Sequence, residues 1–155
     1  MHINIRGGSK SQRKYARSMI EFCRKRLMPR MYNIEVNLYI KNFGEDDSLG
    51  YAIASDTADS ARPREFDIEV ERSQPMRKFL MTIAHEMVHV KQFARGELYE
   101  STRLGSHRWQ GKWLPKDPDY WESPWEIEAH GREIGLFVRW AEREKLAKYK
   151  WTKEQ

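Results

Sequence analysis

The chain has 155 residues, which is enough for one hydrophobic core and too short for two, so we expect a single domain spanning residues 1–155. Hydrophobic residues make up 39% of the sequence and charged residues 33%, a balance that indicates a soluble protein and excludes one embedded in a membrane. The net charge of +5 is too modest to indicate nucleic-acid binding by itself. The charge is unevenly distributed, with a basic N-terminal segment followed by an acidic stretch from Glu45 to Glu71.

Two further features concern the cellular compartment and the possible metal ligands. The segment Met1–Arg6 lacks the long apolar run of a secretory signal, so we expect a cytoplasmic protein. Cys23 is the single cysteine, and it can form neither an internal disulfide nor a thiolate metal site with a second cysteine. Any metal bound by this chain must therefore be held by imidazoles and carboxylates.

The first half of the chain is predicted to form one helix and three strands. Apolar residues recur with helical spacing over residues 11–28, and Pro29 marks the end of this amphipathic helix. Apolar and polar residues then alternate, as in half-buried strands, at residues 34–40, 49–53 and 66–70. Turn-forming residues lie between the strands at 44–48 and 60–63, and these links are short enough for a mainly antiparallel three-stranded sheet.

A second helix and a less regular segment follow. Pro75 suits the first turn of the helix, apolar residues form one stripe along it, and the helix ends near Gly96. Residues 97–122 are rich in glycine, proline and aromatic residues, so we expect an irregular excursion or a short hairpin around Arg103 to Leu114.

A third, long helix is predicted to run from residue 124 to about Tyr149. Ser123 suits the N-cap position, Pro124 the first helical position and Glu126 the third. Serine and glutamate at this spacing predict a capping box, in which the Glu126 side chain is held at the start of the helix.

The segment His85-Glu86-Met87-Val88-His89 lies within the second helix and carries the strongest chemical signal in the sequence. A helix turns by about 100° per residue, so His85 and His89 project from one face, one turn apart, where both imidazoles can bind one zinc ion. Glu86 lies on the adjoining strip, within reach of a water activated by the metal, and suits the role of general base. The sequence therefore predicts a zinc site with hydrolytic chemistry.

A tetrahedral zinc site of this kind needs a third protein ligand. The remaining candidates are His107, His130 and the acidic residues of the third helix. Glu128 shares a helical stripe with Gly131 and Gly135, whose small size would let the metal-bearing helix approach closely. Glu126 lies on a different face and has the capping role. We therefore expect Glu128 to be the third ligand, with Glu126 as the alternative.

His85-Glu86-Met87-Val88-His89, followed by Pro124-Trp125-Glu126-Ile127-Glu128-Ala129, resembles the motifs of the gluzincin metallopeptidases. In size and in its order of elements, the chain from Tyr32 onward also looks like minimal gluzincins and the SprT-like metallopeptidases encoded by phages. This resemblance implies a zincin-like α+β fold in which His85, His89 and Glu128 bind Zn²⁺ and Glu86 activates water.

The expected function is that of a zinc-dependent peptidase that hydrolyses peptide bonds with metal-activated water and with Glu86 as the general base. Zincins bind extended peptide substrates along an edge strand. We expect the acidic strand Glu65–Glu71 to be that edge and to favour basic peptides. A hydrogen-bond donor to the developing oxyanion is also expected, and its candidates are Tyr120, His107 and His130.

The alternative is a noncatalytic module in which zinc stabilises the helices and the surface binds nucleic acid or a protein partner. The basic residues of the N-terminal helix would suit nucleic acid. Both hypotheses require bound zinc, and they differ in whether Glu86 is needed for function.

Overall fold

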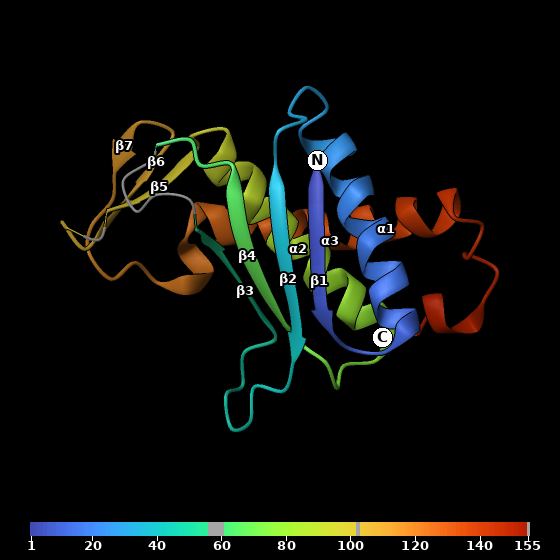
Figure 1. The fold of residues 1–155 in the computed structure, drawn as a ribbon. Coiled ribbons are helices and arrows are strands. Elements are labelled where there is room, and N and C mark those ends of the chain that lie inside the picture. Colours follow the sequence, from blue (N-terminus) through green and yellow to red (C-terminus); the bar gives the residue numbers. More distant parts are fainter. Residues whose placement is uncertain (56–60, 102, 155) are drawn as a thin grey trace.

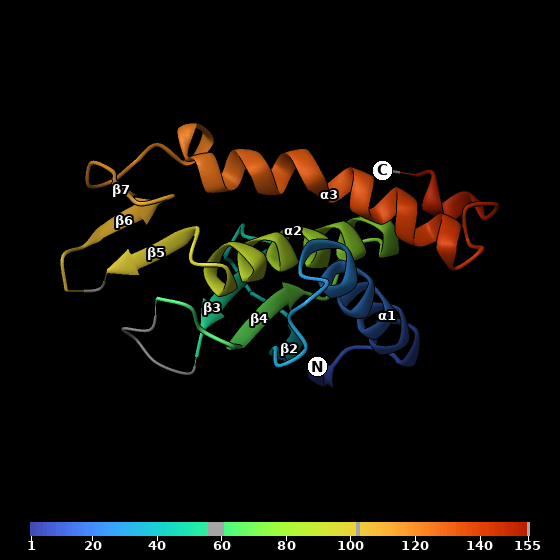
Figure 2. The ribbon, with the colours of Figure 1, turned by 90° about the horizontal axis from the view of Figure 1, so that it is seen from above.

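The computed structural model describes residues 1–55, 61–101 and 103–154 and arranges most of them in three layers. The first layer is the main sheet, formed by β1 (His2–Gly7), β2 (Glu35–Lys41), β3 (Gly50–Ala54) and β4 (Glu65–Glu71). One face of this sheet is covered by α1 (Lys10–Leu27) and α2 (Met76–Ala94), and α3 (Pro124–Arg143) lies along α2 on the side away from the sheet (Figure 1 and Figure 2). Asp56, Asp59 and Ser60, which belong to the predicted acidic stretch and turn, lie outside the described residues.

The main sheet is mostly parallel, with the strand order β1-β2-β4-β3. β1 pairs parallel with β2, β2 pairs parallel with β4, and β3 pairs antiparallel with β4. The predicted mainly antiparallel three-stranded sheet is therefore wrong. β1, α1 and β2 form a crossover unit, the usual connection between parallel neighbours, and β1 is a strand that the sequence analysis did not predict.

β4 lies inside the sheet and β3 forms its edge, so the prediction that Glu65–Glu71 is the edge strand is wrong. Alternate residues of β4, namely Phe66, Ile68 and Val70, are fully buried beneath the helices. The acidic residues of β4 therefore project from the opposite face of the sheet, away from α2. They do not face a site built on α2, and they give no reason to expect a preference for basic peptides.

β3 approaches α2 through small residues. The alternating pattern predicted that the large apolar residues of this segment face the core, but Leu49, Tyr51 and Ile53 are 38%, 39% and 59% exposed. The partly buried positions are instead Gly50, Ala52 and Ala54. Because these residues are small, the edge of the sheet can lie close to α2.

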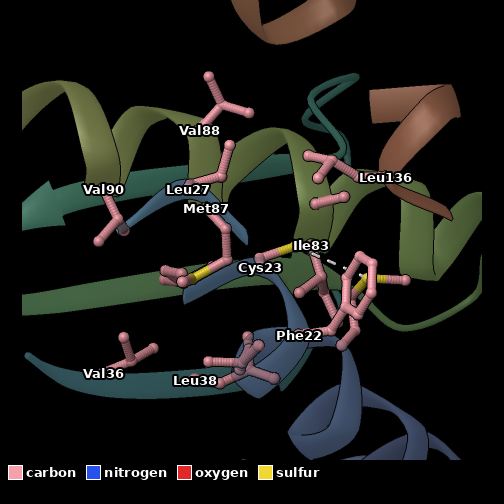
Figure 3. Packing of buried hydrophobic residues seen from close by; sticks show 14 of the residues in the cluster. Phe22, Cys23, Leu27, Val36, Leu38, Ile83, Met87, Val88, Val90 and Leu136 are labelled. Carbon is pink, nitrogen blue, oxygen red and sulfur yellow. Dashed lines mark hydrogen bonds between the residues drawn. The ribbon is translucent and has the colours of Figure 1, made fainter. Parts of the chain in front are cut away.

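The core joins the sheet to the helices (Figure 3). The buried cluster includes Phe22, Cys23 and Leu27 of α1, Val36 and Leu38 of β2, Ile83, Met87, Val88 and Val90 of α2, and Leu136 of α3. The described residues thus form one α+β domain with three α-helices and mixed sheets, as the predicted fold class requires at this level.

The helix ends differ from the prediction only in the third helix. α1 and α2 follow the predicted segments closely. α3 ends at Arg143 and not near Tyr149, because Lys145 adopts a left-handed conformation with φ 60° that a helix cannot contain. Within the described ranges, no helix is both long and apolar enough to span a membrane.

Between α2 and α3 the chain forms a second, smaller sheet. It consists of β5 (Leu98–Ser101), β6 (Ser106–Trp109) and β7 (Lys112–Trp113), all antiparallel, so the predicted excursion takes the form of hairpins. A short 3-10 helix, η1 (Tyr120–Glu122), leads into α3, and a second, η2 (Lys150–Thr152), follows it. The small sheet lies beside the start of α3 and the end of α2 (Figure 2).

Candidate metal centre

α2 presents His85 and His89 on the side that faces α3, as the helical spacing predicts, and Glu86 on the adjoining strip toward Gly50 of β3. All three residues are buried, with 8%, 5% and 6% of their surface exposed. Nε2 of His85 lies 3.2 Å from Nε2 of His89. The two imidazoles therefore converge on one point, as binding to a single ion requires.

Glu126 of α3 completes this group. Its carboxylate oxygens lie 3.1 Å from Nε2 of His85 and 3.0 Å from Nε2 of His89. One atom from each of these three residues could hold a metal ion. The predicted third ligand, Glu128, does not lie beside the histidines, and its alternative, Glu126, occupies that place.

Two local features explain why the carboxylate beside the histidines is not the predicted one. Ser123 is the N-cap residue of α3, but its hydroxyl donates to the carbonyl oxygen of Asp119 at 2.8 Å and no capping box forms. The Glu126 side chain is therefore free to reach the histidines. A Cβ added at Gly131 or Gly135 would meet no atom within 4 Å apart from the neighbouring backbone of its own helix, so the stripe of small residues does not face α2.

Glu128 belongs instead to a charged network beside the site. Its carboxylate accepts hydrogen bonds from Nζ of Lys91 at 2.8 Å, Nε2 of Gln92 at 2.9 Å and Nε of Arg132 at 3.1 Å. Burial opposes ionisation, but the hydrogen bonds from Lys91 and Gln92 hold the pKa of Glu128 below its usual value. Lys91 is buried and also pairs with Glu97 at 2.8 Å. Glu128 is thus held by positive partners and away from the metal-binding atoms.

Gln92 connects this network to His89. The Gln92 side chain is fully buried, and its Nε2 donates to the carbonyl oxygen of Trp125 and to Glu128, both at 2.9 Å. Because both partners only accept, Oε1 of Gln92 must face Nδ1 of His89, at 2.8 Å, and this Nδ1 must carry the hydrogen. Nε2 of a neutral His89 is then the unprotonated nitrogen that faces the metal position.

Glu133 orients His85 in the same way. Its Oε2 lies 2.8 Å from Nδ1 of His85 and accepts a hydrogen bond from it. Sequence reasoning missed both Glu133 and Gln92, although their spacing carries a signal. Glu133 follows Glu126 by seven residues, and Gln92 follows His89 by three, so each shares a helical face with a residue of the metal-binding group.

The donor set suits a zinc ion. With hydrogens on both Nδ1 atoms, the two Nε2 atoms and the Glu126 carboxylate are acceptors separated by 3.0 to 3.2 Å, with no hydrogen between them. Ligand atoms at about 2.0–2.1 Å from a tetrahedral zinc lie about 3.3–3.4 Å apart, which is close to these separations. The group could therefore hold a cation, and its separations and ligand types fit zinc.

The short distances between His85, His89 and Glu126 also shift the pKa values of these residues. Burial by itself would lower the pKa of His85, but hydrogen bonds with Glu126 and Glu133 raise it to about 10. The pKa of His89 is also raised, against the effect of burial, by Glu126. Burial opposes ionisation of Glu126 as well, yet the two histidines hold its pKa well below the usual value. Without a metal, protons on the histidines thus balance the carboxylates.

Glu86 lies beside the metal-binding group without joining it. Burial raises the pKa of its carboxyl to about 7, although the neighbouring histidines oppose the rise. A group with a pKa near neutrality can both take up and release a proton, as a general base must. Gly50 leaves room for this carboxyl, because a Cβ added there would lie 3.0 Å from Oε1 of Glu86 and 2.7 Å from Cγ2 of Thr82.

A cavity of about 460 Å³ opens over these residues. Its wall contains the metal-binding group, Glu86 and residues 48–52 at the start of the edge strand β3. Further lining residues come from both ends of α2, from β5 and from the start of α3. A ligand in this cavity could therefore contact the edge strand and the metal position together.

Two of the three predicted oxyanion donors line the cavity. The hydroxyl of Tyr120 lies 2.9 Å from Nε2 of His130, and His130 lies 3.9 Å from Glu126. Burial and the nearby Glu126 carboxylate raise the pKa of Tyr120, so its hydroxyl keeps the proton that a donor needs. His107 does not line the cavity and instead pairs with Glu100 at 3.3 Å.

Comparison of the chain with protein-family models, with curated proteins and with solved structures finds no match. No relative therefore assigns a role to a residue of this site. The function has to be inferred from the chemistry of His85, His89, Glu126 and Glu86.

Proposed function

We propose that this protein is a zinc-dependent peptidase of the gluzincin type, in which His85, His89 and Glu126 bind Zn²⁺ and Glu86 is the general base. The observation that carries the proposal is the convergence of three metal-binding atoms beside a buried carboxyl, in one cavity. Structural zinc sites are usually closed by four protein ligands, whereas a catalytic site keeps one position open toward a cavity. A set of three ligands on a cavity wall therefore supports a catalytic rather than a structural zinc site.

Each residue of the site has a chemical part in this proposal. Bound zinc would activate water and polarise the scissile carbonyl group. Glu86 would take a proton from the water and pass it to the leaving amine. Tyr120 and His130 would donate hydrogen bonds to the oxyanion.

An extended peptide would bind beside β3. This strand pairs with β4 on one side, lies at the edge of the sheet and lines the cavity next to Glu86. An edge strand can pair with a peptide through backbone hydrogen bonds, so a substrate could add to the sheet there. Close packing at Gly50 would keep such a peptide near the general base.

The experiment that tests this proposal compares the wild type with Glu86→Gln. Both proteins should bind zinc equally, because Glu86 is not among the proposed ligands. Cleavage of a peptide library, followed by mass spectrometry, should fall about 10²- to 10⁴-fold in the variant. Glu142→Gln is a matched control, since it removes an exposed carboxylate near the far end of α3 and should cleave as the wild type does.

The alternative, a noncatalytic module stabilised by zinc, predicts the opposite result. Zinc-loaded wild type would cleave no peptide of the library, and Glu86→Gln would keep the binding of nucleic acid or of a protein partner. Two arginines of the basic helix α1 already have structural partners, because Arg13 donates to the carbonyl of Gly8 and Arg17 to that of Ile3. These contacts give two of the basic side chains of α1 a structural role.

A further inference from the structure

The cavity beside the metal-binding group continues past His89 toward the C-terminal end of α2. There its wall is formed by Phe93, one helical turn after His89, by Leu98 of β5 and by Trp125 at the start of α3. These three residues are 8%, 2% and 7% exposed. This part of the wall is therefore apolar and closely packed.

Glu100 adds a carboxylate to the same wall. Leu98 and Glu100 are two residues apart in β5, so their side chains project from one face of the strand, and both line the cavity. Glu100 pairs across the hairpin with His107, whose Nε2 lies 3.3 Å from Oε1 of Glu100. His107 in turn stacks on Trp125 with 4.8 Å between ring centroids. The carboxylate is thus oriented by its neighbours while about half of its side chain remains accessible.

We propose that this wall is the subsite for a lysine or arginine side chain of the substrate, with Glu100 as the residue that determines this specificity. The proposal rests on the peptidase function proposed above. The aliphatic stem of the substrate side chain would lie along Phe93, Leu98 and Trp125, and its terminal cation would pair with Glu100. A carboxylate paired with one histidine nitrogen still has lone pairs for such a donor.

The charges along the cavity favour this arrangement. Among the described residues that line the wall past His89 on this side and are not proposed zinc ligands, Glu100 carries the charge, and it is acidic. Lys78 is the basic residue of the described lining, and it precedes Phe93 by 15 residues, or about 22 Å along α2. A cation at Glu100 would therefore meet no nearby basic lining residue in the described part of the chain, whereas an acidic side chain would be repelled.

Peptide binding to the zinc-loaded Glu86→Gln protein tests this subsite without turnover. Fluorescence anisotropy would compare peptides that differ at one residue, which is lysine, arginine, methionine or glutamate, with the variable residue moved along the peptide. At one position, lysine and arginine should give about tenfold tighter binding than methionine, and the preference should shrink in high salt. Glutamate at that position should weaken binding.

Two variants assign the preference to Glu100. Glu100→Gln should remove it, and Glu100→Lys should reverse it in favour of glutamate, while Glu142→Gln controls for the change in net charge and should leave it intact. Because the side chain of Glu100 is about half exposed, Glu100→Gln should keep the wild-type Tm. Equal affinity for all four peptides at every position, or a lysine preference that survives Glu100→Gln, would overturn the subsite and leave the peptidase proposal standing. Binding of no peptide at all would overturn both.

Discussion

Gln92 accepts a hydrogen bond from Nδ1 of His89 at 2.8 Å while its amide nitrogen is held by Glu128 and by the carbonyl oxygen of Trp125. This contact determines which nitrogen of His89 faces the metal position. It also gives Glu128 an indirect part in the site, because Glu128 fixes the orientation of the Gln92 amide. Residues that orient a metal-binding histidine contribute to metal affinity even though they do not touch the metal.

Replacing Gln92 with leucine should weaken zinc binding about 10- to 100-fold, because His89 loses the acceptor that fixes its tautomer and orientation. Competition with a chromophoric chelator measures the zinc affinity, and the absorption spectrum of the cobalt-substituted protein reports the ligand geometry. Arg132→Ala removes the outermost partner of Glu128 and should leave both readings unchanged. Wild-type zinc affinity in a folded Gln92→Leu protein would show that the contact does not position His89.

Alanine at Glu126 and at Glu128 should have different effects. Glu126→Ala should abolish tight zinc binding, since it removes one of the three converging ligands. Glu128→Ala should retain zinc but destabilise the fold by about 1–3 kcal/mol, because buried Lys91 and Gln92 lose an acceptor. Zinc stoichiometry and urea unfolding of the zinc-free proteins separate the two effects. A Glu128→Ala protein without zinc beside a zinc-loaded Glu126→Ala protein would restore the original sequence-based assignment.

Gly50→Ala should reduce peptidase activity on the order of a hundredfold while zinc binding persists. The added methyl group would lie 3.0 Å from Oε1 of Glu86 and 2.7 Å from Cγ2 of Thr82, so Thr82, the general base or the edge strand must shift. Gly131→Ala is the matched control, because nothing lies within 4 Å of its added Cβ and alanine favours a helix by about 0.5–1 kcal/mol over glycine. Full activity of Gly50→Ala would refute the close packing of β3 against Glu86.

Removal of zinc should make stability depend on pH in a defined direction. In the zinc-free protein the pKa of His85 is raised from its ordinary value of 6.5 to about 10 by Glu126 and Glu133, against the effect of burial. The stability contributed by the protonated histidine is therefore fully present below pH 6.5 and is lost as the pH rises toward 10. Zinc competes with fewer protons at higher pH, so the difference in Tm between zinc-loaded and chelator-treated protein should widen across this range. Scanning fluorimetry measures both Tm values, and a difference that does not change with pH would contradict the proposed ligands.

The sequence alone determines those features that depend on residues close to one another in the chain. The apolar spacing over residues 11–28 and 75–96 predicts α1 and α2, because helical periodicity is a local property. The shared face of His85 and His89 follows in the same way, since side chains four residues apart in a helix always lie one above the other. The segments of β2, β3 and β4 are also predicted by local alternation.

Tertiary structure decided the strand order and the third metal-binding residue. β4 lies between β2 and β3 because strands far apart in the chain pair in the sheet, and local alternation carries no information about the partner. Glu126 takes the place predicted for Glu128 because the hydroxyl of Ser123 bonds to Asp119 and leaves the Glu126 side chain free. Two carboxylates two residues apart in one helix differ little in sequence terms, and only the packing of α3 on α2 brings one of them to the histidines.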